Sequence, residues 1–447
     1  MLLCMVAGGA WAIDGPDLSA MTWPTPIINE DFSDATVNSS TDKHNPTITN
    51  YTALGAFNGI YCNKAGSYGI ENSVFGTDNK AMFITPNGSS PIVASITNKT
   101  FGTTGAFSFK TKTSCRGYVG LYKVTDANAI THANASVYLY INNTKIQISK
   151  GSSWVDVGTY NSNTEIEVTV IYNNTTSSTN YGGDVTLAAK TAHVYVNNVC
   201  VMDGTSPKDF SIPGADIAAF RVVGALNSTT INVDDVKIYD KLPTKTENLN
   251  LAAACTDGSM YYGTYSNTSA FVVPSDLIVS EVSVIDGKLY VEDYDTNDIV
   301  PANTGVLISS DTSGEHTITL TTGGNSLLDT DNMLRATGTG ITSSDMSDAD
   351  ANCVFYRLTM HNGTALGFYW GATDGAAFDI AANKAYLAVP TSLAKDGFGF
   401  GGDETTGINL NVNENVTNAP MYNMAGQRVG EGYKGLVIVN GKKFINK

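Results

Sequence analysis

Two acids with a spacing suited to hydrolytic chemistry stand in the segment Glu165-Ile166-Glu167. Apolar and polar residues alternate as far as Val170, which predicts a strand with both acids on its polar face. Alpha carbons two positions apart on a strand are separated by about 6.5 to 7 Å, so the carboxyl groups could approach the spacing of a retaining glycosidase. Two solvated acids on the outer face of a strand would show the same pattern, so the spacing alone does not establish catalysis.

Other patterns of enzyme chemistry are missing from the sequence. Its five histidines are far apart, with neither H-E-x-x-H nor H-x-H spacing, and no G-x-S-x-G elbow occurs. The run Gly397 to Gly402 has the letters of a dinucleotide fingerprint, but Asp403 and Glu404 follow it where a helix should receive a phosphate. We therefore predict no catalytic residue and no enzymatic activity.

A sugar-binding site needs an aromatic ring that can stack on C–H groups, with amides and carboxylates at its edge. Trp154, Tyr160 and Tyr181 fall in or beside turns rich in Asn and Ser, and they are the ligand-binding residues that we predict. Tyr138 and Tyr140 share one face of another predicted strand. The chain has 22 tyrosines, so some exposed rings are expected without any ligand.

The charge of the chain excludes one class of partner. Its 447 residues carry a formal net charge of −16, with an isoelectric point near 4.6. Such a field repels phosphate backbones, so nucleic acid is not expected as a partner, whereas calcium or a neutral ligand fits. The acidity would also keep a secreted protein soluble. No segment approaches the roughly 18 apolar residues of a membrane-spanning helix.

The first residues indicate export. Met1 to Ala12 carry no charge and end on the small-x-small pattern Ala10-Trp11-Ala12, which predicts a signal peptide cleaved before Ile13. No basic segment precedes the apolar run, so we expect the true start further upstream. Cleavage removes Cys4 and leaves five scattered cysteines without C-x-x-C spacing, which predicts single thiols in place of a disulfide framework or a zinc site.

Residues 27–243 consist of short alternating strands separated by turns rich in Asn, Gly and Ser. This pattern predicts an antiparallel β-sandwich. The two ends of the region, Asn29 to Asp34 and Ile231 to Tyr239, and the hairpin Val194 to Val199 resemble the laminin-G or concanavalin-like jelly rolls of secreted proteins.

This resemblance implies two expectations about chemistry. Jelly rolls similar to this one often bind a structural calcium between their first and last strands, which points to Glu30, Asp31 and Asp235 as ligands. Concanavalin-like glycosidases of the laminarinase kind carry a third acid further along the strand face of the catalytic pair, where this chain has Thr169. That departure argues against catalysis by the acid pair.

Residues 253–396 form a second alternating unit. Its phrases Phe271 to Pro274, Val300 to Ile308 and Ala382 to Pro390 look like an accessory β-domain that recurs in secreted proteins of Bacteroidetes-type bacteria. Such domains accompany many different proteins, so the resemblance implies nothing about activity.

The C-terminal residues suggest a sorting signal. Ala419 to Val429 and Lys434 to Ile445 resemble the last strands of a Por-type, or type IX, sorting domain, which implies delivery to the cell surface and contact with the secretion machinery. The same residues could instead form a hairpin that extends the preceding domain, with Asn440-Gly441 as its turn.

The sequence thus predicts an all-β protein with an N-terminal jelly-roll β-sandwich, a second smaller β-sandwich domain and a short C-terminal β-hairpin segment. We expect a secreted or outer cell-surface protein, without catalysis, that binds glycan or extracellular matrix through the jelly roll. A polysaccharide-degrading hydrolase or lyase, and a structural surface or adhesin component without a small ligand, are the alternatives. The predicted boundaries are 1–12 for the signal peptide, 13–26 for a linker, 27–243 for the jelly roll, 244–252 for a linker, 253–396 for the accessory domain, 397–412 for a Gly-rich linker and 413–447 for the sorting-like segment.

Overall fold

The computed structural model consists mainly of antiparallel β-strands in two compact units, Met1–Thr246 and Glu247–Lys447. The predicted signal peptide, Cys115, Cys255 and residues 401–412 of the predicted linker lie outside the described residues. The structure describes residues 16–40, 44–48, 54–62, 66–77, 79–88, 91–113, 116–123, 135–142, 144–150, 153–183, 185–202, 216–226, 230–254, 260–285, 287–328, 331–361, 365–400, 421–423, 428–430, 435–439 and 442–446.

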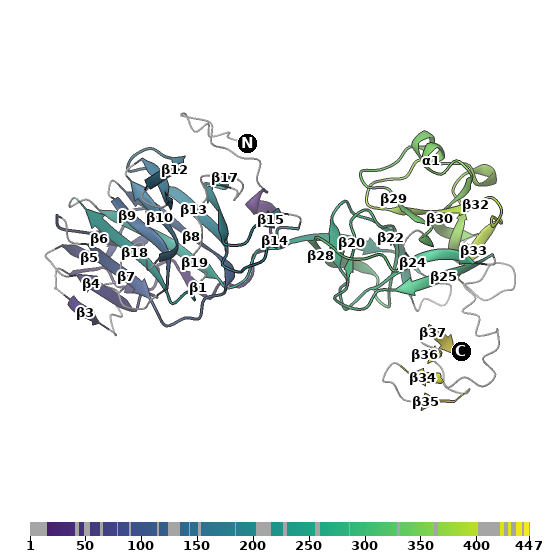
Figure 1. The fold of residues 1–447 in the computed structure, drawn as a ribbon, viewed down its shortest axis with the longest axis horizontal. Helices are drawn as coiled ribbons and strands as arrows, with labels where there is room; N and C mark the ends of the chain where they lie inside the picture. Colours follow the sequence, from purple (N-terminus) through teal and green to yellow (C-terminus); the bar gives the residue numbers. More distant parts are fainter. Residues whose placement is uncertain are drawn as a thin grey trace. The chain divides into compact units, whose positions relative to one another are not determined.

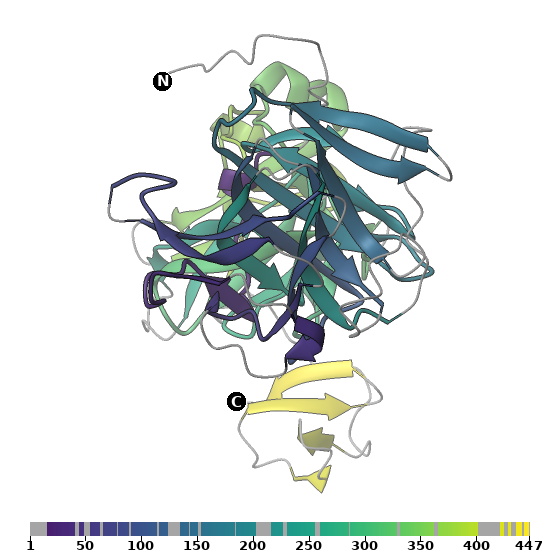
Figure 2. The ribbon, with the colours of Figure 1, turned by 90° about the vertical axis from the view of Figure 1, so that its left-hand side faces the viewer.

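Two large antiparallel sheets build the first unit (Figures 1 and 2). The nine-stranded sheet has the order β17-β16-β13-β8-β19-β6-β5-β2, with β1 also paired to β19, and the eight-stranded sheet has the order β12-β11-β10-β9-β18-β7-β4-β3. A separate pair joins β14 (Thr179–Tyr181) to β15 (Val185–Leu187). The strands of the larger sheet are β1 (Ile28–Glu30), β2 (Asn38–Ser40), β5 (Ser67–Asn72), β6 (Lys80–Thr85), β8 (Thr104–Thr113), β13 (Ile166–Asn173), β16 (Thr191–Val196), β17 (Val199–Met202) and β19 (Ile231–Tyr239). Those of the smaller are β3 (His44–Ile48), β4 (Gly59–Cys62), β7 (Ile92–Ile96), β9 (Arg116–Tyr122), β10 (Ala135–Asn142), β11 (Lys145–Lys150), β12 (Ser153–Thr159) and β18 (Ala219–Leu226).

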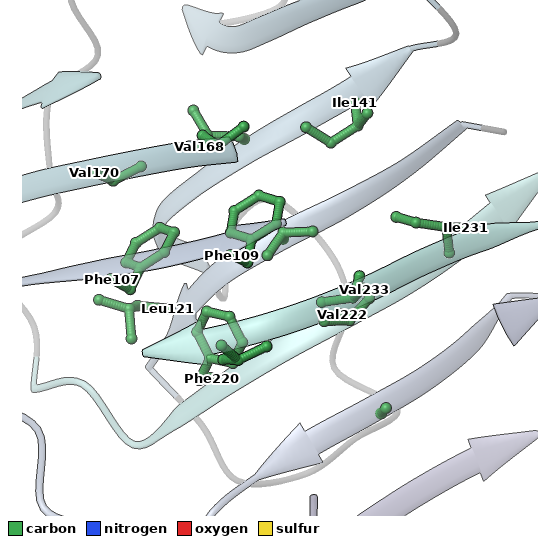
Figure 3. Packing of buried hydrophobic residues seen from close by; sticks show 14 of the residues in the cluster. Phe107, Phe109, Leu121, Ile141, Val168, Val170, Phe220, Val222, Ile231 and Val233 are labelled. Atoms are coloured by element: carbon green, nitrogen blue, oxygen red, sulfur yellow. The ribbon is translucent and has the colours of Figure 1, made fainter. Parts of the chain in front are cut away.

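The inward side chains of both sheets form one hydrophobic core, as the alternation of apolar and polar residues predicts (Figure 3). Phe107 from β8 meets Phe220 from β18 edge-on, with the ring centroids 5.5 Å apart, so the two sheets are packed face to face. Val168 and Val170 from β13 are fully buried in the same core. The predicted β-sandwich is therefore confirmed.

Two predicted local features are also present in the structure. The first strand β1 pairs with the last strand β19, with Ile28 opposite Ile238 and Glu30 opposite Val236. The predicted hairpin turn at Asn197-Asn198 joins β16 to β17, and both residues have positive φ, 49° and 63°. Asn tolerates this left-handed backbone, which a two-residue hairpin turn requires.

The outer faces of the two sheets are more covered than strand alternation predicts. Thr169, on the polar face of β13, is only 5% exposed. The segment before β1 covers this face, because a 3-10 turn at Leu18–Ala20 packs in a small hydrophobic cluster with Tyr239 and because Thr22 bridges to Thr244. The expectation that this strand face meets water was wrong at Thr169.

The second unit contains three small antiparallel sheets and a C-terminal one. A single α-helix among its described residues, α1 (Ser343–Ala349), is capped by the Thr342 hydroxyl, which accepts from the Asp345 amide. The predicted C-terminal hairpin appears as β36 (Gly435–Val439) paired with β37 (Lys442–Asn446). The sheets have the orders β20-β28-β23-β26, β21-β22-β27-β24-β25, β29-β32-β30-β31-β33 and β35-β34-β36-β37. The remaining bounds are β20 (Lys245–Leu251), β21 (Ala253–Ala254), β22 (Tyr261–Tyr265), β23 (Ala270–Val272), β24 (Ile278–Ile285), β25 (Lys288–Asp293), β26 (Ile299–Val300), β27 (Val306–Ser310), β28 (Gly314–Thr321), β29 (Leu334–Ala336), β30 (Cys353–His361), β31 (Ala365–Trp370), β32 (Ala385–Pro390), β33 (Gly397–Gly399), β34 (Met421–Asn423) and β35 (Arg428–Val429).

Within the described ranges, no helix has the length and apolar character needed to span a bilayer. Of the cysteines in those ranges, Cys62 and Cys200 are buried, and Cys353 is partly buried. Burial of the first two agrees with the prediction of single structural thiols.

Candidate functional site

Trp154 lies on the outer face of the eight-stranded sheet, on a bed of three tyrosine rings. Its ring centroid is 4.6 Å from that of Tyr140, 5.9 Å from that of Tyr118 and 6.0 Å from that of Tyr138. Trp154 is the second residue of edge strand β12, which agrees with the predicted position in or beside a turn. It remains partly exposed, whereas Tyr138 and Tyr140 are each 7% exposed. The indole and the Tyr118 ring are therefore the accessible members of the cluster.

A polar ladder runs beside these rings on the same sheet face. Tyr140, Gln147 and Asp156 are direct neighbours across β10, β11 and β12. The Asp156 carboxylate accepts from Lys145 Nζ and from Gln147 Nε2, both at 2.5 Å. Asn142 Nδ2 in turn donates to Gln147 Oε1 at 3.2 Å. The ladder fixes amide, carboxylate and ammonium groups at the edge of the aromatic cluster.

Burial makes this cluster an apolar environment. It raises the pKa of Tyr118 to about 12, and the neighbouring Tyr140 and Tyr138 add to the shift. Arg221 lies below the surface, with its guanidinium carbon 4.7 Å from the Tyr122 ring centroid, and this residue is fully buried. This cation–π contact, and not solvent, therefore lies beneath the aromatic cluster.

The other two predicted ligand-binding rings occupy different surroundings. Tyr160 is 7% exposed and belongs to the core between the sheets. Tyr181 is 2% exposed, and its hydroxyl lies 2.7 Å from His193 Nδ1 and 2.5 Å from the Tyr195 hydroxyl. The structure brings neither of them to Trp154, and both rings are covered by protein, so a sugar could not stack on them here.

The predicted calcium ligands each have a protein partner. The Glu30 carboxylate accepts from the backbone amides of Phe32 at 2.7 Å and Ala56 at 2.6 Å, which secures the loop after β1. Asp31 accepts from the Ser33 amide at 2.9 Å, and hydrogen bonds from Ser33 hold the pKa of that carboxyl below its usual value.

Asp235 interacts with a base and not with the other two acids. It has a positive φ of 47° at a bulge in β19, and its carboxylate lies 2.6 Å from Lys110 Nζ. This partner raises the pKa of Lys110. Among the described residues, no group of three or more His, Cys, Asp or Glu side chains could hold a metal ion. These three acids do not form the oxygen cage that calcium needs, and calcium binding at them stays a prediction.

The two acids of the possible hydrolase pair are not brought together in a cleft. Glu167 lines a cavity on the outer face of the nine-stranded sheet, and Glu165, just before β13, is not among the residues that line it. No other Asp or Glu of the described residues lines this cavity. A paired-carboxylate mechanism would need a second acid there.

Sequence reasoning missed most of the residues that gather at this cavity. Trp23 and Tyr239 come from opposite ends of the jelly roll and pack with ring centroids 5.0 Å apart. Lys237 lies two positions before Tyr239 on β19. The pairing of the first and last strands was the available signal, because it brings the residues before β1 next to the end of β19.

Comparison with known proteins gives similarity to solved β-proteins and no sequence family. No protein-family model matches the chain, and no curated protein matches it. A sialidase is similar over 47% of this chain and 18% of its own length, with 10% identity and a TM-score of 0.28. Domain 4 of AbnA, a GH43 extracellular arabinanase from Geobacillus stearothermophilus solved with arabinotriose, matches 50% of this chain and 94% of its own, at 16% identity and a TM-score of 0.28. The metal-free carbohydrate recognition domain of Emp46p matches 39% and 88%, at 8% identity and a TM-score of 0.25.

Proposed function

We propose that the first unit is a non-catalytic glycan-binding module whose ligand stacks on Trp154. The observation that supports this proposal is the partly exposed indole on its bed of tyrosines, with the Asn142–Gln147–Asp156–Lys145 ladder at its edge. Sugars present C–H groups on the faces of their rings and hydroxyls around them, so they suit an aromatic surface with a polar border.

The arrangement favours binding over catalysis. Both oxygens of Asp156 are already used as acceptors, one by Lys145 and one by Gln147. A general acid or nucleophile needs a carboxyl group that can reach the glycosidic bond, usually with a second carboxyl on the other side. The ladder offers a single acid, held by a base.

Export and a surface location are part of the same proposal. The predicted signal peptide and the resemblance of the C-terminal residues to a sorting segment support them. The partner of the module would then be a glycan or a glycosylated matrix outside the cell, with the C-terminal segment contacting the secretion machinery.

A glycan array tests the proposal with the chain from Ile13 to Lys447, its Trp154→Ala variant and a control variant at an exposed ring outside the first unit, Tyr422→Ala. Loss of an aromatic stacking partner is expected to weaken binding roughly twofold to tenfold, because such contacts contribute about 0.5 to 1.5 kcal/mol. The control should bind as the parent does. A repeat with a calcium chelator tests the calcium prediction separately.

The same incubations report on the alternatives. Release of reducing sugar from a bound polysaccharide would show the hydrolase and overturn the non-catalytic proposal. Binding that Trp154→Ala leaves unchanged would place the ligand elsewhere. Failure to bind any glycan or matrix component would favour a structural role for the surface.

A further inference from the structure

A cavity of about 270 Å³ lies on the outer face of the nine-stranded sheet, the opposite face of the sandwich from Trp154. Thr169 on β13, Ser108 on β8 and Lys237 on β19 are direct neighbours across three adjacent strands and line it. On the same face, Tyr239 lies two residues after Lys237 on β19. Glu167 lies two residues before Thr169 on β13, towards the opposite end of the cavity. The sheet therefore presents both polar and aromatic groups to the cavity.

The segment before β1 forms the apolar wall of the cavity. Leu18, Met21 and Trp23 line it, and Trp23 packs against Tyr239. Two backbone hydrogen bonds join Thr22 to Thr244, at 2.7 and 3.0 Å. The wall is thus fixed to the segment that follows β19, next to the indole, so the aromatic surface is held in place before any ligand arrives.

Four polar side chains in the cavity lack protein partners. The side chains of Glu167 and Lys237 make no hydrogen bond or ion pair within the described part of the chain, and neither do the hydroxyls of Ser108 and Thr169. Ser108 is 7% exposed and Thr169 is 5% exposed. Neither hydroxyl oxygen is among the fully buried atoms that lack a partner, so both are open to a ligand or water in the cavity that can bond to them.

The charge of the lining selects against ions. Its ten residues include one acid, Glu167, and one base, Lys237, and the two do not pair with each other. An anion would be opposed by Glu167, and a cation would be opposed by Lys237. A neutral molecule with several hydroxyls can donate to the carboxylate and accept from the ammonium at once.

The volume limits the size of the ligand. The cavity has a volume of about 270 Å³. This lies just below the range of about 300 to 1,000 Å³ found for pockets of drug-sized ligands. That space suits one six-membered sugar ring with its hydroxyls.

We propose that this cavity binds one neutral pyranose unit of a glycan. The ring lies against Trp23, and its hydroxyls bond to Glu167, Lys237, Ser108 and Thr169. The site goes beyond the one at Trp154, because it lies on the other sheet and shares no residue with it. With both sites filled, one module joins two glycan segments, which raises the avidity for a dense surface well above that of either site.

The experiment uses the full mature chain carrying Trp154→Ala, so that any binding observed comes from the cavity. The probes are methyl glycosides of neutral hexopyranoses, with glucuronic acid and glucosamine as charged counterparts, followed by saturation-transfer NMR. Neutral glycosides are expected to bind in the millimolar range, more tightly than both charged sugars. Glu167→Gln should weaken that binding at least about fivefold, because a neutral amide makes weaker hydrogen bonds to sugar hydroxyls than a carboxylate does.

The matched control is Glu165→Gln, which changes an exposed acid two residues away that does not line the cavity. It should leave binding unchanged. Trp23→Ala should also abolish the signal, and thermal unfolding checks that the wall still folds; Glu167→Gln remains informative if it does not. Tighter binding of glucuronic acid that Lys237→Met removes and Glu167→Gln does not would overturn the proposal in favour of an anion site. Absence of saturation transfer from every neutral glycoside would overturn it outright, whatever the array shows for Trp154.

Discussion

The two outer faces of the jelly roll differ in how their polar groups are satisfied. Around Trp154, amide, carboxylate and ammonium groups bond to one another and to neighbouring strands. Around Trp23, a carboxylate, an ammonium and two hydroxyls face a cavity without protein partners. Both faces are built on strands that alternate apolar and polar residues, so the difference comes from what covers each sheet.

The chain segments next to each set of polar groups explain the contrast. The hairpin of β11 and β12 belongs to the eight-stranded sheet, so its polar side chains pair in register with those of β10. The segment before β1 is mostly irregular and covers the nine-stranded sheet with apolar side chains, which leave the polar groups beneath without partners. We infer that the first face is a rigid platform open to varied sugars, whereas the second selects ligands by size and charge.

The strongest test removes the support that both faces share. Phe220 is fully buried, and its ring centroid lies 5.5 Å from that of Phe107 on the opposing sheet. Phe220→Ala is expected to lower the free energy of unfolding of the first unit by about 3 to 5 kcal/mol, through lost burial and the cavity left behind. Urea unfolding followed by tryptophan fluorescence measures the change.

The control for this variant is Val199→Ala, at a side chain that is 43% exposed, where a change within about 0.5 kcal/mol is expected. The two proposed binding activities should weaken together in Phe220→Ala. If one activity survived at full strength in a protein that had lost this stability, that site would lie on a part that folds independently of the shared core.

Much of the fold was predictable because alternation in a strand depends on local sequence. Ile166, Val168 and Val170 had to share a face, and the structure buries all three in the core. The turn at Asn197-Asn198 was equally local, since Asn tolerates positive φ. The capped helix Ser343–Ala349 was not predicted, because seven residues are too few for a helical period to stand out.

The sites were less predictable because they depend on contacts between distant residues. Trp154 was singled out for a position beside a turn, yet its surroundings come from Tyr118, Tyr138 and Tyr140 on two other strands. The cavity joins Trp23 to Tyr239, which are more than 200 residues apart. The sequence also did not indicate the partners of the acids. Glu30 bonds to backbone amides, and Asp235 pairs with Lys110.

A smaller effect, limited to one face, is expected from Gly120→Ala. Gly120 lies opposite Tyr138 in the eight-stranded sheet with a φ of 156°, and a Cβ there would overlap the Val137 carbonyl oxygen and the Tyr138 backbone. The strand must shift, so stability should fall by more than about 1 kcal/mol. Glycan binding at Trp154 should weaken, while neutral glycosides should still enter the cavity.

Gly158→Ala is the matched control on the same sheet, because the nearest atom to its added Cβ would be Val196 Cγ2 at 3.5 Å, an ordinary contact. Stability and binding should stay close to those of the parent. Equal loss of binding at both sites in Gly120→Ala would mean that the two faces are mechanically coupled through the core, and the contrast between them would have to be abandoned.

The smallest expected effect concerns the pKa values of tyrosines on the two faces. It does not change the stability of the protein at neutral pH. The pKa of Tyr118 is raised to about 12 by burial among other rings. In the unfolded chain a tyrosine ionises near pH 10, so both states hold the proton below that value and the contribution of Tyr118 to stability is fully present. Between about pH 10 and 12 the unfolded state loses its proton first, and this contribution falls as the pH rises.

NMR titration of ring-labelled tyrosine, with Tyr118→Phe to assign the signal, measures this pKa directly. Trp154→Ala should lower the pKa of Tyr118 toward 10, because water then reaches the phenol. On the other face, burial and then the Glu167 carboxylate raise the pKa of Tyr239, so Glu167→Gln should lower the pKa of Tyr239 and leave that of Tyr118 unchanged. Ionisation of Tyr118 near pH 10 in the parent protein would show that water already enters the Trp154 cluster. The Trp154 face would then not be a closely packed platform, and the contrast with the cavity on the other face would no longer hold.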